Sequence, residues 1–247
     1  MNWKQKSLIQ RTCAALPFGS EAFYYFLQRN FGSMRHAPDP MPNLREFVGI
    51  AEEMREMGFS IEGRRAMEVG TGRRLDMPIA MYLAGAASVV TVDLHQYMKH
   101  ELAQAAFDVM KANKKEILEI FGRLAGNDAV AARFAELEAA SSTEDLMRRA
   151  KIEYRAPSDA SRTGLPSGSI DFQFSYTVFE HIPYPVLAAI LKECSRLLSP
   201  QGIACHHIDP SDHFAHDDQS INFCNFLRFE DEEFDKVNEN QFAYQNR

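Results

Sequence analysis

The stretch MEVGTGRRLDMPIAMYLAGAASVVTVDLH, residues 67–95, constrains the fold more than any other part of the chain. An apolar run ends at Val69, two glycines follow, and a helix-like run leads to a second apolar run that ends at Asp93. Gly70 and Gly72 can take backbone angles closed to other residues, so a ligand can approach the main chain there. The next helix begins with unpaired N–H groups, and an acid after the second strand can accept ribose hydroxyls. The stretch therefore predicts the start of a nucleotide-binding parallel sheet.

Two residues of the same stretch indicate the kind of ligand. Leu75 stands where the third glycine of the dinucleotide pattern Gly-x-Gly-x-x-Gly would fall, and that glycine brings the helix close to the pyrophosphate. Glu68 stands two residues before Gly70, where a carboxylate would repel a pyrophosphate and attract a cation. The pattern favours a positively charged nucleoside over a dinucleotide. A nicotinamide-dependent oxidoreductase is the alternative that these residues argue against.

Short apolar runs alternate with helical stretches along most of the remaining chain. Alternation of this kind predicts βαβ units and a parallel sheet. Pro78 lies in the opening turn of the helix after the first strand, where a missing N–H costs little, and Gly85 is expected to end that helix. A turn at Pro200 and Gly202 is expected to lead into the last strand. The expected strands are Ala66–Val69, Ser88–Asp93, Lys151–Arg155, Ser169–Tyr176 and Gly202–Asp209.

Two further regions have helical patterns. Residues 96–150 are too long for a simple crossover, and their composition predicts two or three amphipathic helices. These helices are expected to be broken at Gly122, Gly126 and Asn127. Residues 1–62 are expected to form a helical extension, with a capping box at Asn43 and Glu46 and a helix end at Gly58. The aromatic helix EAFYYFLQRNFG within it is either a packing face or a lid over a pocket for a second substrate.

The motifs around both glycines resemble those of a known family. EVGTGRR followed by VVTVDLH resembles the first two motifs of class I S-adenosylmethionine-dependent methyltransferases, although Arg73 or Arg74 stands where a third glycine often lies. SDASRTGLPSGSIDFQFSYTVFEHI, residues 158–182, resembles the third and fourth motifs, so Asp159 and Ala160 would contact adenine. Ser175 and Tyr176 would flank the methyl donor. The resemblance implies S-adenosyl-L-methionine as the cofactor, held by Glu68, Gly70, Thr71, Gly72, Asp93, Leu94, Asp159, Ala160 and Ser175.

The resemblance covers roughly residues 64–213 and implies an α/β fold, a Rossmann-like parallel sheet with helices on both faces. The family's sheet ends with two more strands, and no convincing hairpin follows, so the final strands are expected to be missing, as in a fragment. The expected division is an N-terminal extension at 1–62, a methyltransferase core at 63–213 with a helical insertion at 96–150 between strands 2 and 3, and an incomplete polar segment at 214–247.

The stretch CHHIDPSDHFAHDD, residues 205–218, is the densest polar cluster of the chain and follows the fifth expected strand. A hydroxyl acceptor needs a base, and histidine titrates near neutral pH. We therefore expect His181, Asp209 and His213 to be catalytic residues on the acceptor side. A divalent metal held by these residues is a further alternative, but no fixed ligand spacing supports it, so no metal ligand is predicted. A polar loop whose side chains cap local turns is the alternative.

The segment that begins at residue 206 and the end of the chain resemble a bacterial group of type-11-like methyltransferases, some of which occur with enzymes of surface-glycan assembly. This resemblance implies a transferase that methylates a small molecule, for instance a hydroxyl of a glycan precursor. A non-catalytic nucleoside-binding module of the same fold is the alternative. The sequence does not indicate the oligomeric state.

The composition sets limits on partners and location. The net charge of −7 gives no overall basic field that would attract nucleic acid or anionic lipid. No apolar run reaches the length of a membrane span, which takes roughly 18 residues or more. The four cysteines are widely spaced without a Cys-x-x-Cys pair, which is typical of reduced thiols in a cytoplasmic protein.

Overall fold

The computed structural model describes residues 2–32, 34, 36–238, 240 and 242–246. The chain divides into two compact units. The larger one, which we call the core unit, consists of Ala37–Tyr176 and Pro185–His207. The smaller one, which we call the histidine unit, consists of Met1–His36, Thr177–Tyr184 and Ile208–Arg247. The boundary expected at residue 62 therefore falls inside the core unit.

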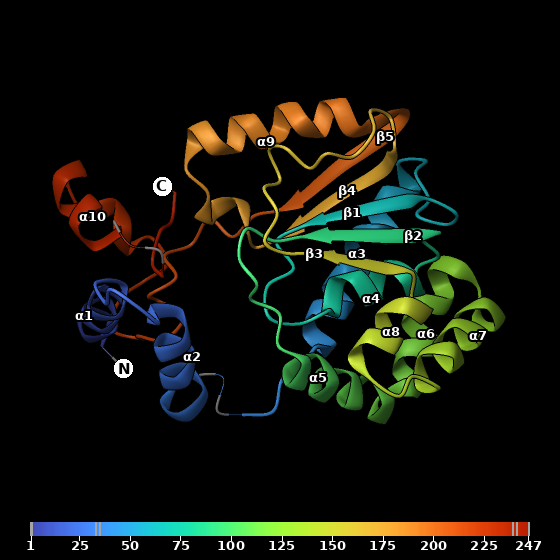
Figure 1. The fold of residues 1–247 in the computed structure, drawn as a ribbon, viewed down its shortest axis with the longest axis horizontal. Helices are drawn as coiled ribbons and strands as arrows, with labels where there is room; N and C mark the ends of the chain where they lie inside the picture. Colours follow the sequence, from blue (N-terminus) through green and yellow to red (C-terminus); the bar gives the residue numbers. More distant parts are fainter. Residues whose placement is uncertain (1, 33, 35, 239, 241, 247) are drawn as a thin grey trace. The chain divides into compact units, whose positions relative to one another are not determined.

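The core unit is built on one sheet of five parallel strands in the order β3-β2-β1-β4-β5 (Figure 1). Helix α9, Tyr184–Leu197, lies along one face of the sheet, and α3, Met41–Glu56, and α4, Asp76–Leu83, lie along the other (Figure 1). The expected Rossmann-like α/β fold with helices on both faces is confirmed. The strands are β1, Arg65–Val69; β2, Ser88–Val92; β3, Ile152–Arg155; β4, Ile170–Tyr176; and β5, Leu198–His207.

The first crossover follows the sequence signals closely. Pro78 lies in the opening turn of α4, as expected, and every residue of that helix is buried. Gly85 ends the helix with a φ of +112°, which suits glycine because it has no Cβ. Its N–H donates to Tyr82 O at 3.0 Å, and the N–H of Ala86 donates to Met81 O at 3.0 Å. These two bonds satisfy carbonyls at the helix end and turn the chain into β2.

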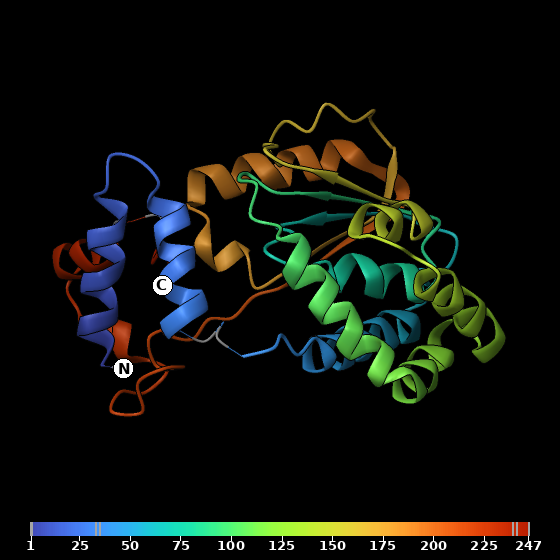
Figure 2. The same cartoon turned by 60° about the horizontal axis from the view of Figure 1, so that its bottom comes forward.

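The insertion between β2 and β3 contains four helices, one more than the upper expectation. They pack with α3 and α4 on the same side of the core unit, where Figure 2 shows them in green to yellow-green. Gly126 separates the second from the third with a φ of +82°, as expected, and Asn127 begins the third. The break expected at Gly122 is wrong, because Gly122 lies inside the second helix. The helices are α5, His100–Ala112; α6, Lys114–Ala125; α7, Asn127–Glu138; and α8, Thr143–Arg149.

Helix α3 belongs to the core unit because its apolar face packs on the sheet. Phe47 stacks edge-on against Phe174 of β4, with ring centroids 5.4 Å apart. The capping box expected at Asn43 and Glu46 is wrong: the helix begins two residues earlier, and the Oδ1 atom of Asp39 accepts a hydrogen bond from Met41 N at 3.0 Å. Both residues lie inside the helix, where the Asn43 side chain contacts Asp76 and Glu46 accepts a hydrogen bond from Tyr176.

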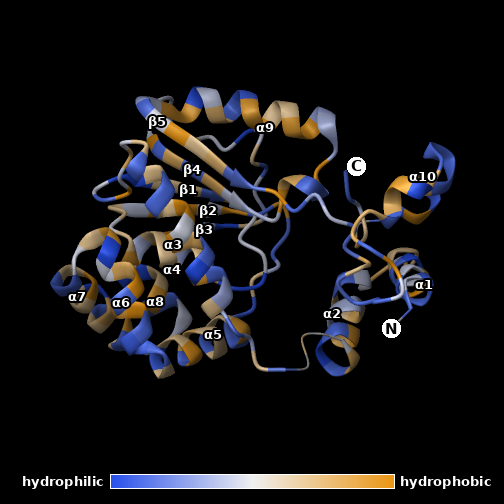
Figure 3. Ribbon diagram, turned by 180° about the vertical axis from the view of Figure 1, so that it is seen from behind, coloured by the Kyte–Doolittle hydropathy of each residue, from blue (hydrophilic) through white to orange (hydrophobic). Residues whose placement is uncertain are grey.

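Strand β5 and helix α9 form the other border of the sheet. The expected turn at Pro200 and Gly202 is wrong, since β5 begins at Leu198 and passes through both residues with a register shift against β4. Only Ile190, Cys194 and Leu197 of α9 are fully buried. Figure 3 shows that hydrophilic and hydrophobic residues are mixed along this helix. One narrow stripe therefore packs on the sheet.

The histidine unit is assembled from three separate stretches of chain. Trp3 packs against Phe214 and Phe229, with ring centroids 5.8 and 5.6 Å apart, and Tyr24 stacks on Phe242 at 4.3 Å. Its helices are α1, Trp3–Ala14; α2, Ser20–Phe31; the short η2, Phe179–His181; η3, Asn225–Arg228; and α10, Asp231–Asn238. The described residues after β5 form no strand. Over the described part of the chain, every helix is too short or too polar to cross a membrane.

Candidate functional site

The turn after β1 has the geometry that its glycines predict. Gly70 has a φ of +88° and Gly72 a φ of +64°, both in the left-handed region that favours glycine. The N–H of Gly70 donates to Val92 O at 2.8 Å, which joins the turn to β2. A Cβ atom at Gly72 would meet nothing within 4 Å. The turn therefore leaves open space in front of its backbone, where a ligand can lie.

Asp93 stands directly after β2 and is held by backbone groups. Its Oδ2 atom accepts the N–H of Gly72 at 2.8 Å, and its Oδ1 atom accepts the N–H of His95 at 3.1 Å. The next residue, Leu94, is exposed. The first glycine turn and the end of β2 thus meet through Asp93, as the sequence predicts.

Glu68 lies on β1 below the glycine turn and is only 2% exposed. It accepts a hydrogen bond from the hydroxyl of Thr91, which in turn lies 2.5 Å from the hydroxyl of Thr71. Burial raises the pKa of Glu68 to about 8, and the nearby charge of Asp93 adds to the increase. The sequence suggested a charged carboxylate here. In the structure the buried surroundings disfavour the charge of Glu68 and favour its protonated form.

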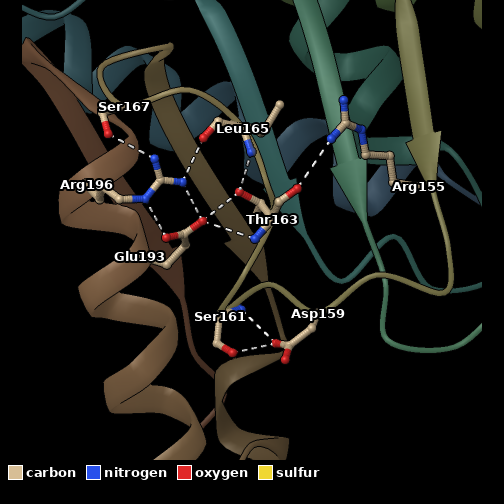
Figure 4. Close-up of polar contacts among 8 residues, drawn as sticks. All are labelled: Arg155, Asp159, Ser161, Thr163, Leu165, Ser167, Glu193 and Arg196. Atoms are coloured by element: carbon tan, nitrogen blue, oxygen red, sulfur yellow. Dashed lines mark hydrogen bonds and ion pairs between the residues drawn. The ribbon is translucent and has the colours of Figure 1, made fainter.

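Asp159 and Ala160 lie on the loop between β3 and β4, which a polar network fastens to α9 (Figure 4). Glu193 of α9 accepts hydrogen bonds from the backbone and hydroxyl of Thr163 at 3.0 and 2.7 Å. Arg196 donates to Leu165 O at 2.7 Å and to Ser167 Oγ at 2.9 Å. The Arg196 guanidinium beside Glu193 holds the pKa of that carboxyl at about 2. The network fixes the course of the loop.

The Asp159 side chain has a local partner of its own. Its Oδ1 atom accepts the N–H of Ser161 at 2.8 Å and the hydroxyl of Ser161 at 2.7 Å (Figure 4). Its Oδ2 atom lies 3.6 Å from the guanidinium of Arg162. These contacts are those of a turn-forming aspartate. The position of Asp159 after β3 agrees with the adenine contact that the family resemblance implies, and its present bonds shape the turn.

The end of β4 carries polar groups on both faces of the sheet. The Ser175 hydroxyl is buried and lies 2.9 Å from His206 Nδ1, and burial lowers the pKa of His206 to about 4. On the opposite face the ring of Tyr176 stacks on His207 with centroids 4.7 Å apart. Thr177 follows with a φ of +51°, a strained conformation for threonine of the kind found at functional sites.

Glu46 of α3 is a residue that the sequence did not assign to the site. Its Oε2 atom accepts a hydrogen bond from the Tyr176 hydroxyl, and its Oε1 atom lies 2.9 Å from His207 Nε2. The sequence pattern instead predicted that this glutamate forms half of a capping box. No local signal connects residues of α3 with the ends of β4 and β5, because the contact depends on the packing of α3 on the sheet.

The three expected catalytic residues lie in the histidine unit. We use the name histidine cluster for Glu180, His181, Asp209, His213 and His216. His213 Nε2 lies 3.3 Å, and His216 Nε2 3.2 Å, from Asp209 Oδ2. The rings of His181 and His213 have centroids 4.7 Å apart. The structure therefore brings His181, Asp209 and His213 together, and adds Glu180 and His216.

Burial changes the ionisation of this cluster. It lowers the pKa of His213 to about 4, so the ring is neutral at pH 7. Glu180 is 3% exposed, and burial raises its pKa. Its Oε1 atom accepts the N–H of Asp209 at 3.3 Å, whereas its Oε2 atom is buried with no hydrogen-bond partner among the described residues. Sequence reasoning missed Glu180, whose only signal is its position beside His181.

A cavity of about 490 Å³ lies within the histidine unit. His181 and His213 contribute polar groups to its wall. Tyr24, Leu27 and Phe31 of α2 also line it. The aromatic helix thus contributes to a pocket as well as to packing. The volume falls in the range of small-molecule sites, about 300–1,000 Å³.

The sheet defines the class of protein. Order β3-β2-β1-β4-β5 places the switch point between β1 and β4, and ligands of open α/β sheets bind at the carboxyl ends of the strands there. Gly70, Asp93 and Tyr176 all follow or end strands at this edge. The core unit therefore has a Rossmann-like α/β fold, with an open glycine turn and the Asp93 carboxylate at the edge where such folds bind ligands.

The family comparison identifies the class further. A family model described as a methyltransferase domain matches residues 114–206, from α6 to β5. The match covers less than half of the chain and agrees with the Rossmann-like fold of the core unit. A Cβ atom at Gly72 would meet nothing within 4 Å, and Asp93 stands beside this turn with its Oδ2 atom on the Gly72 N–H. No curated protein matches the chain.

Solved structures resemble the chain more distantly. The PH0226 protein of Pyrococcus horikoshii is 15% identical with a TM-score of 0.40, and the match covers 68% of this chain and 58% of that one. A putative sarcosine dimethylglycine methyltransferase of Galdieria sulphuraria is 14% identical with a TM-score of 0.39, covering 66% and 46%. A SAM-dependent methyltransferase of Archaeoglobus fulgidus is 15% identical with a TM-score of 0.37, covering 88% and 72%. The chain thus spans about half the length of the first two.

Proposed function

We propose that the protein transfers the methyl group of S-adenosylmethionine to a hydroxyl of a small molecule, for instance a glycan precursor. The observation that carries the proposal is the open turn at Gly72 joined to Asp93 by a hydrogen bond of 2.8 Å at the carboxyl edge of the sheet. The match to a methyltransferase domain supports the reaction type. The hydroxylated acceptor is supported by the histidine cluster, since an acidic or neutral acceptor oxygen needs a group that takes its proton.

The core unit would hold the cofactor through its backbone and carboxylates. Asp93 would accept the ribose hydroxyls, and Gly70, Thr71 and Gly72 would line the approach of the amino acid part. Leu94, Asp159, Ala160 and Ser175 remain proposed contacts from the family resemblance. Glu68 would stabilise a cation once its proton leaves. When bound, the cofactor supplies a methyl carbon that the acceptor oxygen attacks as the carbon–sulfur bond breaks, with the bonding pair left on sulfur.

The histidine cluster would act on the acceptor. His181, Asp209 and His213 are proposed as the catalytic residues that handle the proton of the hydroxyl. His181 Nδ1 donates a hydrogen bond to Tyr244 O at 2.7 Å, which leaves Nε2 to face other groups. His213 is neutral at pH 7. The His213 imidazole lies on the wall of an aromatic-lined cavity, where it would accept a hydrogen bond from a small molecule bound there, but its lowered pKa makes it a weak base.

The test of the donor site is calorimetry with S-adenosylhomocysteine. Asp93→Ala should weaken binding by more than about tenfold, because two ribose hydroxyls lose a charged acceptor. Asp108→Ala is the matched control: Asp108 is an exposed carboxylate of α5 paired with Lys111 at 2.6 Å, so its removal should leave affinity unchanged. Unchanged affinity in Asp93→Ala would remove Asp93 from the site. Labelled S-adenosylmethionine in a cell extract would then identify the acceptor.

We also propose a cytoplasmic location and a small-molecule acceptor without nucleic acid or membrane partners. The thiols of Cys13, Cys194, Cys205 and Cys224 are all free, which supports a reducing compartment. The net charge of −7 argues against a nucleic-acid substrate.

A further inference from the structure

We propose that the histidine cluster binds one divalent transition-metal ion of the zinc type, with Asp209, His213 and His216 as its protein ligands. The ligand atoms of these three residues all lie within 4.8 Å of one another. A second group, Glu180, His181 and His213, meets the same criterion and shares His213. Two overlapping groups centred on one imidazole define one location for the ion.

The separations between the donor atoms match those around a small tetrahedral ion. Zinc lies about 2.0–2.2 Å from imidazole nitrogen and carboxylate oxygen, so tetrahedral ligands stand about 3.4 Å apart. The two imidazole Nε2 atoms lie 3.3 and 3.2 Å from Asp209 Oδ2. The described residues offer no hydrogen bond to His213 Nε2, in spite of this proximity. The nitrogen and the oxygen are therefore close without the alignment of a hydrogen bond, as two ligands of one ion are.

A second observation concerns Glu180, which the structure buries beside the same histidines. Its Oε2 atom lies in the interior without a hydrogen-bond partner among the described residues. A buried carboxyl oxygen left unpaired is costly. A cation held by His213 would give this oxygen an electrostatic partner. The ammonium group of Lys6, which also lines the cavity, is paired with Asp217 at 2.5 Å and so does not serve as the partner of Glu180.

The groups behind the ligands orient them as outer groups do in known metal sites. Asp209 Oδ1 accepts the N–H of Ser211 at 2.9 Å, which leaves Oδ2 directed to the histidines. The Ser211 hydroxyl lies 2.9 Å from His216 Nε2 and would give up this contact to the ion. Two imidazoles and a carboxylate suit zinc, cobalt or iron better than magnesium or calcium, which prefer oxygen ligands.

Three protein ligands leave a fourth position open, as in catalytic rather than structural zinc sites. His213 also lines the cavity of about 490 Å³, so the open position adjoins a space for a small molecule. A hydroxyl bound to the ion would lose its proton more readily, and His181 Nε2 would be near to receive it. This role rests on the proposed function, whereas metal binding itself does not.

The test uses the full chain, freed of metal with a chelator and then titrated with Zn²⁺ by calorimetry. Wild type should bind one ion per chain. His213→Ala and Asp209→Asn should each weaken binding by at least about 100-fold, since loss of an outer partner alone costs 10–100-fold. His36→Ala is the matched control, because His36 is an exposed histidine of the same unit and should bind Zn²⁺ like wild type. Co²⁺ should give the visible absorption of a four-coordinate ion.

Absence of stoichiometric Zn²⁺ in wild type would overturn the proposal, and so would binding that both variants leave unchanged. Circular dichroism of the metal-free forms shows whether His213→Ala still folds; if it does not, the isosteric Asp209→Asn decides. Asp93→Ala separates the two proposals, since it should lose S-adenosylhomocysteine and keep Zn²⁺. A chain that binds the nucleoside but no metal would leave the donor site intact and refute the metal site alone.

Discussion

The core unit and the histidine unit hold their polar groups by different means. In the core unit the polar side chain is held by backbone groups: Asp93 accepts the N–H groups of Gly72 and His95 at 2.8 and 3.1 Å. In the histidine unit the amide side chain of Asn246 connects separate segments, donating to Phe179 O at 3.1 Å and Ile182 O at 2.8 Å. The proposed donor site is thus part of a continuous sheet, whereas the histidine cluster depends on a few long-range side-chain bonds.

The core unit also buries more apolar side chains than the histidine unit does. Phe172 and Phe174 of β4 are fully buried, and a large cluster of other buried side chains surrounds them. Helix α2 of the histidine unit, by contrast, buries none of its residues fully. Regions with little buried apolar surface open at lower free energy than the rest of a protein. We therefore expect the histidine unit to unfold before the core unit, so that the chain is not a two-state folder.

The largest effect should come from Phe174→Ala. Removing a fully buried aromatic ring that packs on Phe47 should destabilise the core unit by about 3–5 kcal/mol. Guanidinium unfolding followed by two signals checks this. Far-UV circular dichroism reports mainly the helices of the core unit, while fluorescence reports the histidine unit, because Trp3 is the single tryptophan of the chain. The circular-dichroism midpoint should move much further than the fluorescence midpoint.

Phe18→Ala provides the matched control. Phe18 is 90% exposed, so its removal creates no cavity and should change neither midpoint. The expectation would be wrong if the circular-dichroism and fluorescence transitions coincide in wild type and move together in Phe174→Ala. That result would show that the two units unfold as one.

Asn246→Ala should destabilise the histidine unit rather than the core unit, and by less than Phe174→Ala destabilises the core unit. It leaves the carbonyls of Phe179 and Ile182 without their donor, at a cost of about 1–3 kcal/mol. Since these bonds fix the turn that carries Glu180 and His181, the tryptophan transition should move to lower denaturant while S-adenosylhomocysteine affinity stays at the wild-type value. Asn30→Ala is the control, because Asn30 is exposed and donates only to Phe26 O of its own helix. A loss of nucleoside affinity in Asn246→Ala would contradict the independence of the two units.

The same contrast explains what the sequence could predict. The strands, Pro78 in the opening turn of α4 and the meeting of Gly72 with Asp93 all follow from signals within a short stretch, because a strand, a turn and a helix are local. Glu46 shows the opposite case. Its partners Tyr176 and His207 lie far away in the sequence, and a local capping pattern offered a wrong explanation for it.

The histidine cluster lies between these cases. His181, Asp209 and His213 were expected on the acceptor side because polar residues gather after β4 and β5. Their close approach depends on the residues near 245, whose role no pattern indicates: the Gln245 side chain binds Ser211 O and accepts the N–H of His213. Glu180 became visible only through its burial. Long-range amide contacts of this kind leave no periodicity in a sequence.

The smallest expected effect concerns Glu68, the one donor-site group whose environment opposes its usual charge. Its pKa is raised to about 8, mainly by burial, from the ordinary carboxyl value near 4.5. Folding therefore favours the protonated form, so its contribution to stability is full below about pH 4.5 and falls as the pH rises toward 8. Glu68→Gln removes this loss. At pH 8 the variant should melt roughly 2–4 °C above wild type, the shift that 1 kcal/mol gives in a chain of this size.

At pH 5 the two proteins should melt at nearly the same temperature, because the glutamine amide can accept the Thr91 hydroxyl as the protonated carboxyl does. Binding of S-adenosylmethionine should shift the protonation equilibrium of Glu68 in the opposite direction. A sulfonium beside Glu68 favours the carboxylate, so wild type should release protons when it binds S-adenosylmethionine at pH 7, whereas Glu68→Gln should release none from this position. Calorimetry in two buffers of different ionisation enthalpy measures the release. Equal proton release by both proteins would show that Glu68 keeps its proton in the complex, and the preference of this turn for a cation would then need another source.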